Sequence, residues 1–404
     1  MPVNTLNVNQ AATILAAALS QAQAGAAVAT PLSTADFVTV QQTVNHIGYD
    51  QLNTALSQVL SRTIFSARPY NRKLRILEAD SERWGAITRK VNYVDEALEA
   101  DPAYTLTNGA SIDMQEVKKP HVIESKFYGF NTFDYHQSIY KQQLQPALRG
   151  PEEWAGFLGG LMQHIQNLLE KTHEESARMC VANMIGATAQ NGATSSNVQL
   201  VTEFNAWIGA SYTTFLDVVQ GGDFDIFVKF AFARIQTISK RMQERQTDLY
   251  HIPLPDPAQN PLSPPLVKIP RATDVRDQRL IVFSPAMDQI NTGILSNLYN
   301  TEYMRLLPYE EVSFWQNIQR PSEIDVTPSY MDATGTAEPS PTPQLVSDVF
   351  AVLYDKDAMG YTTFGESYEV APYNVRGKYW NHFWSFQDRY WNDQSENVVV
   401  FTLT

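Results

Sequence analysis

The sequence predicts an α+β fold, in which long helices and short buried strands share one chain. Helical periodicity is strongest over residues 152–190, where apolar side chains recur every three or four positions. Two apolar runs, 279–283 and 348–354, have the length and composition of buried strands. A chain of 404 residues can bury a large core, in one elaborate domain or in several smaller ones.

The first 83 residues predict an arm followed by helical segments. Residues 1–45 are rich in Ala and Gln and weakly helical, with Gly25 and Pro31 as breaks. From residue 50 onward apolar residues follow helical spacing, until the stretch before Pro69 ends the pattern. We expect the arm to join the main body of the protein at this point.

A long two-stranded ribbon is predicted next. Two β-rich segments, 86–94 and 122–130, flank an acidic stretch with a turn signal at Asn108-Gly109. An isolated ribbon of this length is only marginally stable, so we expect it to lie against its own body or against a neighbouring molecule.

Two helices follow. Pro151, Glu152 and Glu153 are typical of a helix start, and the pattern then continues to residue 190, a span on the order of 50 Å at 1.5 Å per residue. A second helix is predicted over residues 225–248, ended by a proline-rich tract. The tracts 253–270 and 321–343 are expected to be surface loops, with linker or disorder as the competing interpretation.

The rest of the chain predicts a strand, a helix and a strand. Strand 279–283 precedes a helix that begins at Ser284-Pro285, and strand 348–354 is its expected sheet partner. Asp355 is expected to cap a brief helix closed by Gly360. An aromatic segment from 361 to 391 and a final strand over 397–403 complete the chain; we interpret the aromatics as a wall shared between core and interface, with a purely core role as the alternative.

Composition excludes several protein classes. A net charge of −13 and a pI near 5.0 argue against a protein that coats nucleic acid by neutralising phosphates, although an acidic wall around packed DNA fits this charge. Cys180 is the only cysteine, so intramolecular disulfides and cysteine zinc clusters are excluded, and we expect it to be an ordinary buried residue. The Ala-rich run 11–19 lacks a basic flank, and no apolar run reaches the roughly 18 residues that span a bilayer, so we expect use in a cytosol-like compartment.

Motifs that carry catalysis are missing. The sequence has no phosphate-binding glycine loop, no HExxH and no GxSxG. His173-Glu174-Glu175 lacks a second histidine, so a solvated helix face is favoured over zinc. Helix capping is likewise favoured over acid–base chemistry for the pairs Asp223/Asp225 and Asp355/Asp357. We therefore predict no enzyme, no catalytic residue, no metal and no cofactor.

The order of these elements resembles the major capsid protein of tailed double-stranded DNA bacteriophages, the Johnson or Hong Kong 97 type fold. The resemblance covers nearly the whole chain. It rests on the pattern of short sequence stretches and not on invariant motifs, namely RLIVFSPAM at 279–287, ILSNLYN at 294–300 and VFAVLYDKDAMGY at 349–361. The phrase YWNHFWSF at 379–386 is similar to capsid proteins of podovirus-like and gut phages.

The resemblance implies a division of the chain. Residues 1–83 would form the N-terminal arm and helices, 84–130 the E-loop lying over an adjacent subunit, and 131–211 the peripheral domain with its spine helix at about 151–190. Residues 212–343 would form the axial domain with its Pro-rich loops. Residues 344–404 would return as strands that complete the axial and peripheral domains, with the C-terminal strand in the peripheral domain.

The implied function is self-assembly into pentamers and hexamers of an icosahedral shell that encloses double-stranded DNA without specific binding. Expected partners are other copies of the chain, a portal, and scaffolding and decoration proteins, with no membrane; the expected location is the virion capsid, assembled in the host cytoplasm. The candidate inter-subunit contacts are Lys90, Glu96, Glu99, Asp101, Lys118, Lys119, Lys126, Trp380, Trp384, Arg389 and Trp391.

Other interpretations stay open at this point. The ribbon lysines could form isopeptide links, although ordinary salt bridges are favoured. An aromatic-rich glycan-binding surface module is the alternative function, but it would need export, and a signal is missing. A hydrolase that uses the scattered carboxylates comes third, and no placed pair supports it.

Overall fold

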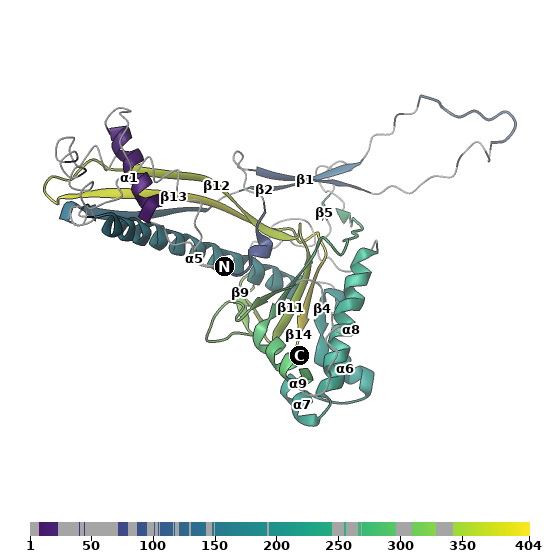
Figure 1. The fold of residues 1–404 in the computed structure, drawn as a ribbon. Helices are drawn as coiled ribbons and strands as arrows, with labels where there is room; N and C mark the ends of the chain where they lie inside the picture. The colour runs from purple at the N-terminus through teal and green to yellow at the C-terminus, as the bar shows by residue number, and fades with distance from the viewer. Residues whose placement is uncertain are drawn as a thin grey trace.

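The computed structural model describes residues 8–22, 40, 44, 72–79, 87–94, 101, 104, 106–115, 117, 121–128, 131–142, 148, 150–191, 194–244, 254–255, 266–267, 269–295, 309–328 and 342–404. An elongated layer and a second unit meet at an elbow, and a thin ribbon projects from the region of the elbow (Figure 1). Among the described helices, none combines the length and apolar character needed to cross a membrane.

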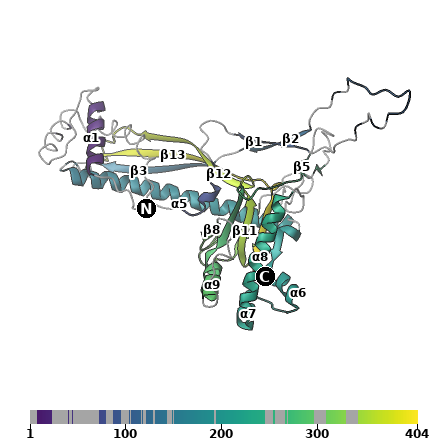
Figure 2. The same cartoon turned by 45° about the vertical axis from the view of Figure 1, so that its right-hand side comes forward.

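The elongated layer consists of one helix and one sheet. Helix α5 (Pro151–Asn191) runs beneath a three-stranded antiparallel sheet with the order β12 (Met359–Val370), β13 (Tyr379–Asn392), β3 (Asn131–Tyr140). Helix α1 (Val8–Ala22) crosses the far end of α5 (Figure 2), where the Trp154 indole donates a hydrogen bond to the Ala11 carbonyl. A separate hydrophobic core fills this layer.

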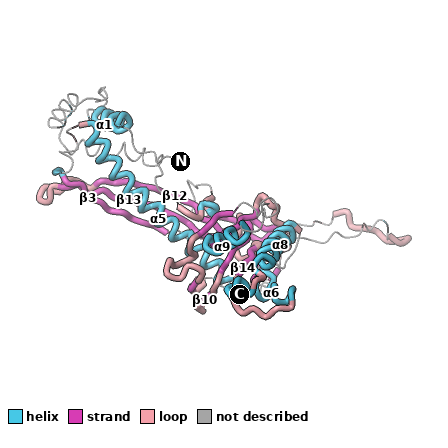
Figure 3. Tube along the Cα trace, turned by 60° about the horizontal axis from the view of Figure 1, so that its bottom comes forward, coloured by secondary structure: helices cyan, strands magenta, loops and turns pink. Residues whose placement is uncertain are grey.

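The second unit is built on a five-stranded sheet. Its order is β4 (Asn197–Gln199), β14 (Val398–Thr402), β11 (Val349–Asp355), β7 (Gln278–Phe283), β8 (Tyr309–Val312); the inner pairs are antiparallel and the two edge pairs parallel. Every residue of β11 is buried, as expected for a central strand that is covered on both faces. Helices α6 (Leu200–Ile208), α8 (Phe224–Gln243) and α9 (Ser284–Leu295) lie around this sheet (Figure 3), and the short helix α7 (Phe215–Gly221) comes between α6 and α8 in the chain.

The remaining elements are short, apart from the ribbon. Strands β1 (Ile87–Tyr93) and β2 (Val122–Tyr128) form the antiparallel ribbon. Two short antiparallel pairs are β5 (Leu254–Pro255) with β6 (Leu266–Val267), and β9 (Ile324–Val326) with β10 (Gln344–Val346). Two 3-10 turns are also present, η2 (Arg75–Leu77) and η4 (Thr194–Ser196), of which η4 comes directly before β4.

Several sequence predictions are confirmed. The helix expected over 152–190 is α5, the ribbon segments are β1 and β2, and the run 279–283 is β7, followed by a helix from Ser284. Strand 348–354 pairs with β7 as expected. The helical segment predicted from residue 50 to Pro69 lies outside the described residues.

One predicted helix is shorter than expected, and another is not found. The helix predicted over 225–248 is α8, and it ends at Gln243 because Glu244 turns to extended backbone. No helix follows Asp355: residues 356–358 form a turn that leads directly into β12, and Gly360 lies within that strand. The C-terminal strand β14 pairs with β11 and β4 in the five-stranded sheet, and its assignment to the peripheral domain stays a prediction.

The two sheets draw on segments that are far apart in sequence. Strand β4 and helix α6 lie with the five-stranded sheet although they precede residue 212, and strands β12 and β13 return to cover α5 (Figure 1). The domain boundary at residue 211 and the names peripheral and axial for the two units stay predictions.

Candidate functional site

The ribbon has one face against the body and one face exposed. Cross-strand register places Lys90, Asn92 and Ile123 on the inner face, where Asn92 and Ile123 are buried. Because side chains alternate along a strand, Val91 and Tyr93 point the other way, and both are more than half exposed. The ribbon is therefore anchored on one side and open on the other.

A buried cluster of charges forms the anchor. The Lys90 ammonium lies 2.7 Å from the Asp393 carboxylate and also contacts Glu396. The Arg271 guanidinium lies 3.2 Å from Glu396 and donates a hydrogen bond of 3.0 Å to the Asn92 side-chain carbonyl. Two cations and two carboxylates thus join the base of the ribbon to the turn between β13 and β14.

Burial and ion pairing act in opposite directions on the pKa values of this cluster. Burial lowers the pKa of the Lys90 ammonium, but the Asp393 and Glu396 carboxylates raise it by more, so its pKa is raised overall. Burial raises the pKa of Glu396, and the two cations oppose that shift without cancelling it. A buried carboxylate of this kind depends on its cations, so loss of one cation weakens the whole anchor.

The far end of the ribbon exposes apolar side chains. Gly109 adopts a left-handed backbone with φ 92°, and the Ala110 amide donates to the Thr107 carbonyl, so the predicted turn is present. Tyr104 is 91% exposed and Met114 95% exposed. Leu106, Ile112 and Val117 are also exposed. Exposed apolar residues gathered on one projection are a feature of surfaces that bind other proteins.

The predicted ribbon contacts fall into two groups. Lys90 is paired within its own chain, Asp101 is exposed, and Lys126 lies half exposed beside Glu124 at 3.3 Å. The other four lie outside the described residues: Glu96, Glu99, Lys118 and Lys119. A role of these residues between subunits stays a prediction.

The C-terminal aromatics are placed differently from the wall that the sequence suggested. Trp380 is 3% and Trp384 2% exposed, and both belong to the core between the three-stranded sheet and α5. Arg389 is also buried, and Trp391 is partly buried, with its ring against Gly360. Packing within the chain, the alternative interpretation, therefore accounts for the two buried tryptophans, and a contact of any of the four with another subunit stays a prediction.

A buried polar network was missed by sequence reasoning. His173 and Glu174 are buried, so the solvated face expected for His173-Glu174-Glu175 is wrong for two of the three residues. His173 Nε2 lies 3.1 Å from the Asp388 carboxylate, and its Nδ1 lies 2.6 Å from the Arg72 guanidinium. Arg72, which comes from the end of the N-terminal region, is thereby fixed to α5 and β13 together.

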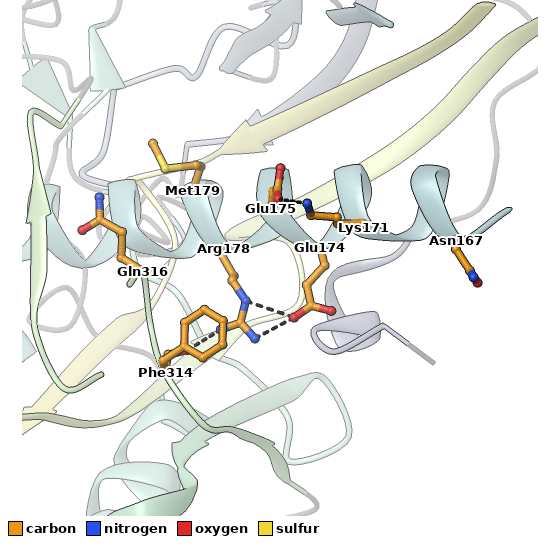
Figure 4. Close-up of a pocket in the computed structure, with 8 residues that line it drawn as sticks. All are labelled: Asn167, Lys171, Glu174, Glu175, Arg178, Met179, Phe314 and Gln316. Atoms are coloured by element: carbon orange, nitrogen blue, oxygen red, sulfur yellow. Dashed lines mark hydrogen bonds and ion pairs between the residues drawn. The ribbon is translucent and has the colours of Figure 1, made fainter. Parts of the chain in front are cut away.

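A pocket of about 650 Å³ is lined by α5 and by Phe314 and Gln316 (Figure 4). The Arg178 guanidinium stacks on the Phe314 ring at 3.8 Å and is held by Glu174 at 2.7 Å. The Lys171–Glu175 ion pair lies on the same helix (Figure 4). These charges are paired with each other, and among the residues that the structure describes no group of His, Cys, Asp and Glu could hold a metal ion.

The paired aspartates have structural partners, but they do not cap helices as expected. Asp223 stands at the N-cap of α8, yet its carboxylate accepts a hydrogen bond of 2.7 Å from the Tyr212 hydroxyl and none from the helix backbone. Asp355 accepts from the Thr273 hydroxyl at 2.6 Å and from the Asp357 amide at 2.9 Å, so it stabilises a turn.

Cys180 is buried, as predicted. Its thiol donates a hydrogen bond of 2.8 Å to the Asn392 side-chain oxygen, and burial raises its pKa to about 12. The thiol is therefore protonated at neutral pH and unsuited to act as a nucleophile.

Comparison with known proteins agrees with this geometry. The family model described as Phi29-like phage major capsid protein matches residues 13–402. A capsid structure of Staphylococcus phage Andhra is similar with a TM-score of 0.50 and 11% identity, over 84% of this chain and 86% of that chain. A structure described as head fiber and inner core protein gp22 of native bacteriophage P68 is similar with a TM-score of 0.50 and 8% identity, over 82% and 84%. No curated protein matches.

At identities of 11% and 8% the solved structures show the fold alone, whereas the family model shows the function. The mixed α+β architecture is that of tailed-phage capsid proteins of the Hong Kong 97 type. The chain belongs to the Phi29-like phage major capsid protein family, whose members are the structural subunits of an icosahedral phage shell.

Proposed function

We propose that this capsid protein assembles into pentamers and hexamers, and that the resulting shell encloses double-stranded DNA without binding a specific sequence. The acidic chain, with a net charge of −13, supports an inner wall that repels packed DNA. In this proposal the unit around α5 is the peripheral domain, and the unit around the five-stranded sheet is the axial domain near the centre of each ring.

The ribbon is proposed to act as the E-loop, which lies over an adjacent subunit. One observation carries this assignment: the base of the ribbon is fixed by the Lys90 cluster, while its far end projects from the body with Tyr104 and Met114 almost fully exposed (Figure 1). A fixed base and an apolar tip suit a segment that reaches a neighbour, because burial of about 25 cal/mol per Å² of apolar surface would then be gained on assembly.

The proposal also covers where the shell is assembled and which other proteins it binds. The shell would be built in the host cytoplasm and would join a portal, with scaffolding and decoration proteins as further partners. No catalytic role is proposed, because the described carboxylates and histidines of the network and the anchor are paired with structural groups.

The experiment compares the chain with a variant of its ribbon tip. The protein would be expressed alone and with its genomic neighbours and viewed by negative-stain electron microscopy. Closed shells, tubes or rings are expected for the natural chain. The variant Tyr104→Ser with Met114→Ser and Val117→Ser should remain folded, since all three side chains are exposed, and should assemble poorly.

A matched control separates assembly from general surface change. Ile318, in the turn after β8, is 74% exposed and does not belong to the ribbon, so Ile318→Ser should assemble like the natural chain. Unimpaired shells from the tip variant would contradict the E-loop assignment. Monomers from the natural chain under every condition would contradict assembly itself. The comparisons give no support to the glycan-binding alternative.

A further inference from the structure

A short segment, residues 72–79, contacts both units of the fold; we call it the strap. It contains the 3-10 turn η2, and its residues Leu74 and Leu77 are 2% and 3% exposed. Both leucines belong to the core that the second half of α5 shares with the five-stranded sheet. Because the strap is buried in this way, its backbone amides need hydrogen-bond partners within the protein.

The two ends of the strap are tied to the elongated layer. Near its start, the Lys73 amide donates a hydrogen bond of 3.3 Å to the Glu174 carboxylate of α5. At its end, the Ala79 amide donates a hydrogen bond of 2.9 Å to the Tyr361 carbonyl of β12. The Arg72 guanidinium lies over the Tyr361 ring, 4.9 Å from its centre. Both ends of the strap are therefore fixed to α5 and β12.

A carboxylate of the other unit holds the middle of the strap. Glu310 lies on β8, at the edge of the five-stranded sheet; its Oε1 accepts a hydrogen bond from the Leu74 amide, and its Oε2 accepts one of 3.1 Å from the Ile76 amide. Leu74 has a left-handed backbone with φ 64°, which is uncommon for a bulky residue. Such a backbone persists only where its surroundings hold it, and N–H bonds to an ionised carboxylate are stronger than those between neutral groups.

We propose that Glu310 sets the angle between the two units by holding the strap, and that this angle determines the curvature of the shell. The inference rests on the proposed function, in which the two units take different places in a ring, and it adds a residue that positions them. In the described sheet β8 is paired with β7 on one side, so Glu310 connects the outer edge of that sheet to α5 and β12. Every subunit repeats the same angle, so a small change in it adds up around a shell.

The angle can be measured on the unassembled chain with two spin labels. Arg376→Cys, in the turn between β12 and β13, and Lys229→Cys, on α8, place one exposed label on each unit, whereas Cys180 is buried. Pulsed electron spin resonance then gives the distribution of distances between the labels. We expect one narrow distribution for the natural strap and a shifted or broader one for Glu310→Gln, because the glutamine NH₂ group places a donor against one of the two amides. Hydrogen exchange of the strap amides should become about tenfold faster or more.

The next residue of β8 provides the matched control. Glu311 points to the opposite face of the strand, so Glu311→Gln removes the same charge and should leave the distances and the exchange unchanged. Natural distances and natural exchange in Glu310→Gln would overturn the proposal. If circular dichroism shows that this variant does not fold, Glu310→Asp takes its place. Its carboxylate is one methylene shorter and cannot reach both amides, so the same two changes are expected, and their absence would overturn the proposal equally.

Electron microscopy of assembled particles tests the link to curvature. Shells of Glu310→Gln should differ in diameter from natural shells or vary more widely, while shells of Glu311→Gln should match the natural ones. A changed label distance together with natural, uniform shells would overturn the link to curvature. Failure of the natural chain to assemble would contradict the proposed function and, with it, this link, whereas the spin-label measurement still decides whether Glu310 holds the angle.

Discussion

Lys90→Met is the sharpest test of the ribbon anchor. The substitution keeps the apolar stem of the side chain and removes the ammonium from between Asp393 and Glu396, whose side chains are only 5% and 7% exposed. Removing one partner of a buried ion pair destabilises by about 3–5 kcal/mol, because the other charge stays buried. Here each carboxylate keeps a second partner, Ser395 for Asp393 and Arg271 for Glu396.

We therefore expect the low end of that range, about 3 kcal/mol, expressed as local detachment of the ribbon. By the relation of 1.4 kcal/mol per factor of ten, amide hydrogens of β1 and β2 should exchange about a hundredfold faster in the variant. Hydrogen exchange followed by mass spectrometry measures this directly on the unassembled chain.

The control for this prediction lies one residue away. Arg89, which is 65% exposed, is on the opposite face of β1, so Arg89→Met should change stability by less than about 1 kcal/mol. If exchange in Lys90→Met is no faster than in Arg89→Met, the buried cluster does not hold the ribbon, and the account of the anchor fails.

Three further predictions concern the body. Cys180, with a pKa of about 12, should react with a thiol reagent at pH 8 only after unfolding; labelling of the native protein at the unfolded rate would contradict its burial. Burial lowers the pKa of His382 from 6.5 to about 4, so its contribution to stability is complete above pH 6.5 and is lost as the pH falls toward 4, by at most about 3 kcal/mol. In urea unfolding, His382→Gln should therefore lose less stability than the natural chain between these pH values. An equal loss in both proteins would show that other groups cause the pH dependence. Leu353→Ala in the central strand β11 should destabilise by about 2–5 kcal/mol in the same assay, and a change below about 1 kcal/mol would show that the core closes over the gap.

The sequence was sufficient where local patterns are long. The apolar spacing over 152–190 predicted α5, and the run 348–354 was apolar enough to predict the buried strand β11. The turn at Gly109 has a left-handed backbone, which the pair Asn108-Gly109 predicts. Such signals depend only on neighbours in the chain.

The anchor and the polar network depend on residues that meet only after folding. Lys90 and Asp393 are 303 positions apart, and Arg72 and His173 are 101 apart, so no local pattern pairs them. From sequence alone each of these charged residues is expected to be exposed, because charged residues are rarely buried unless a partner neutralises them.

One available signal was missed. In β13, Trp380, His382, Trp384, Phe386 and Asp388 alternate with less buried residues, which is the period of a strand with one covered face. The many aromatic residues of this segment instead favoured the interpretation of a surface shared between core and interface.

The central claim, that this chain forms a shell by placing its ribbon on an adjacent copy, is tested most directly by a cryo-electron microscopy reconstruction of particles assembled from it. The account predicts rings in which the ribbon tip of each subunit, with Tyr104 and Met114, lies on the next subunit, while β1 stays anchored through Lys90 on its own body. Shells in which every ribbon tip contacts only its own subunit would contradict it.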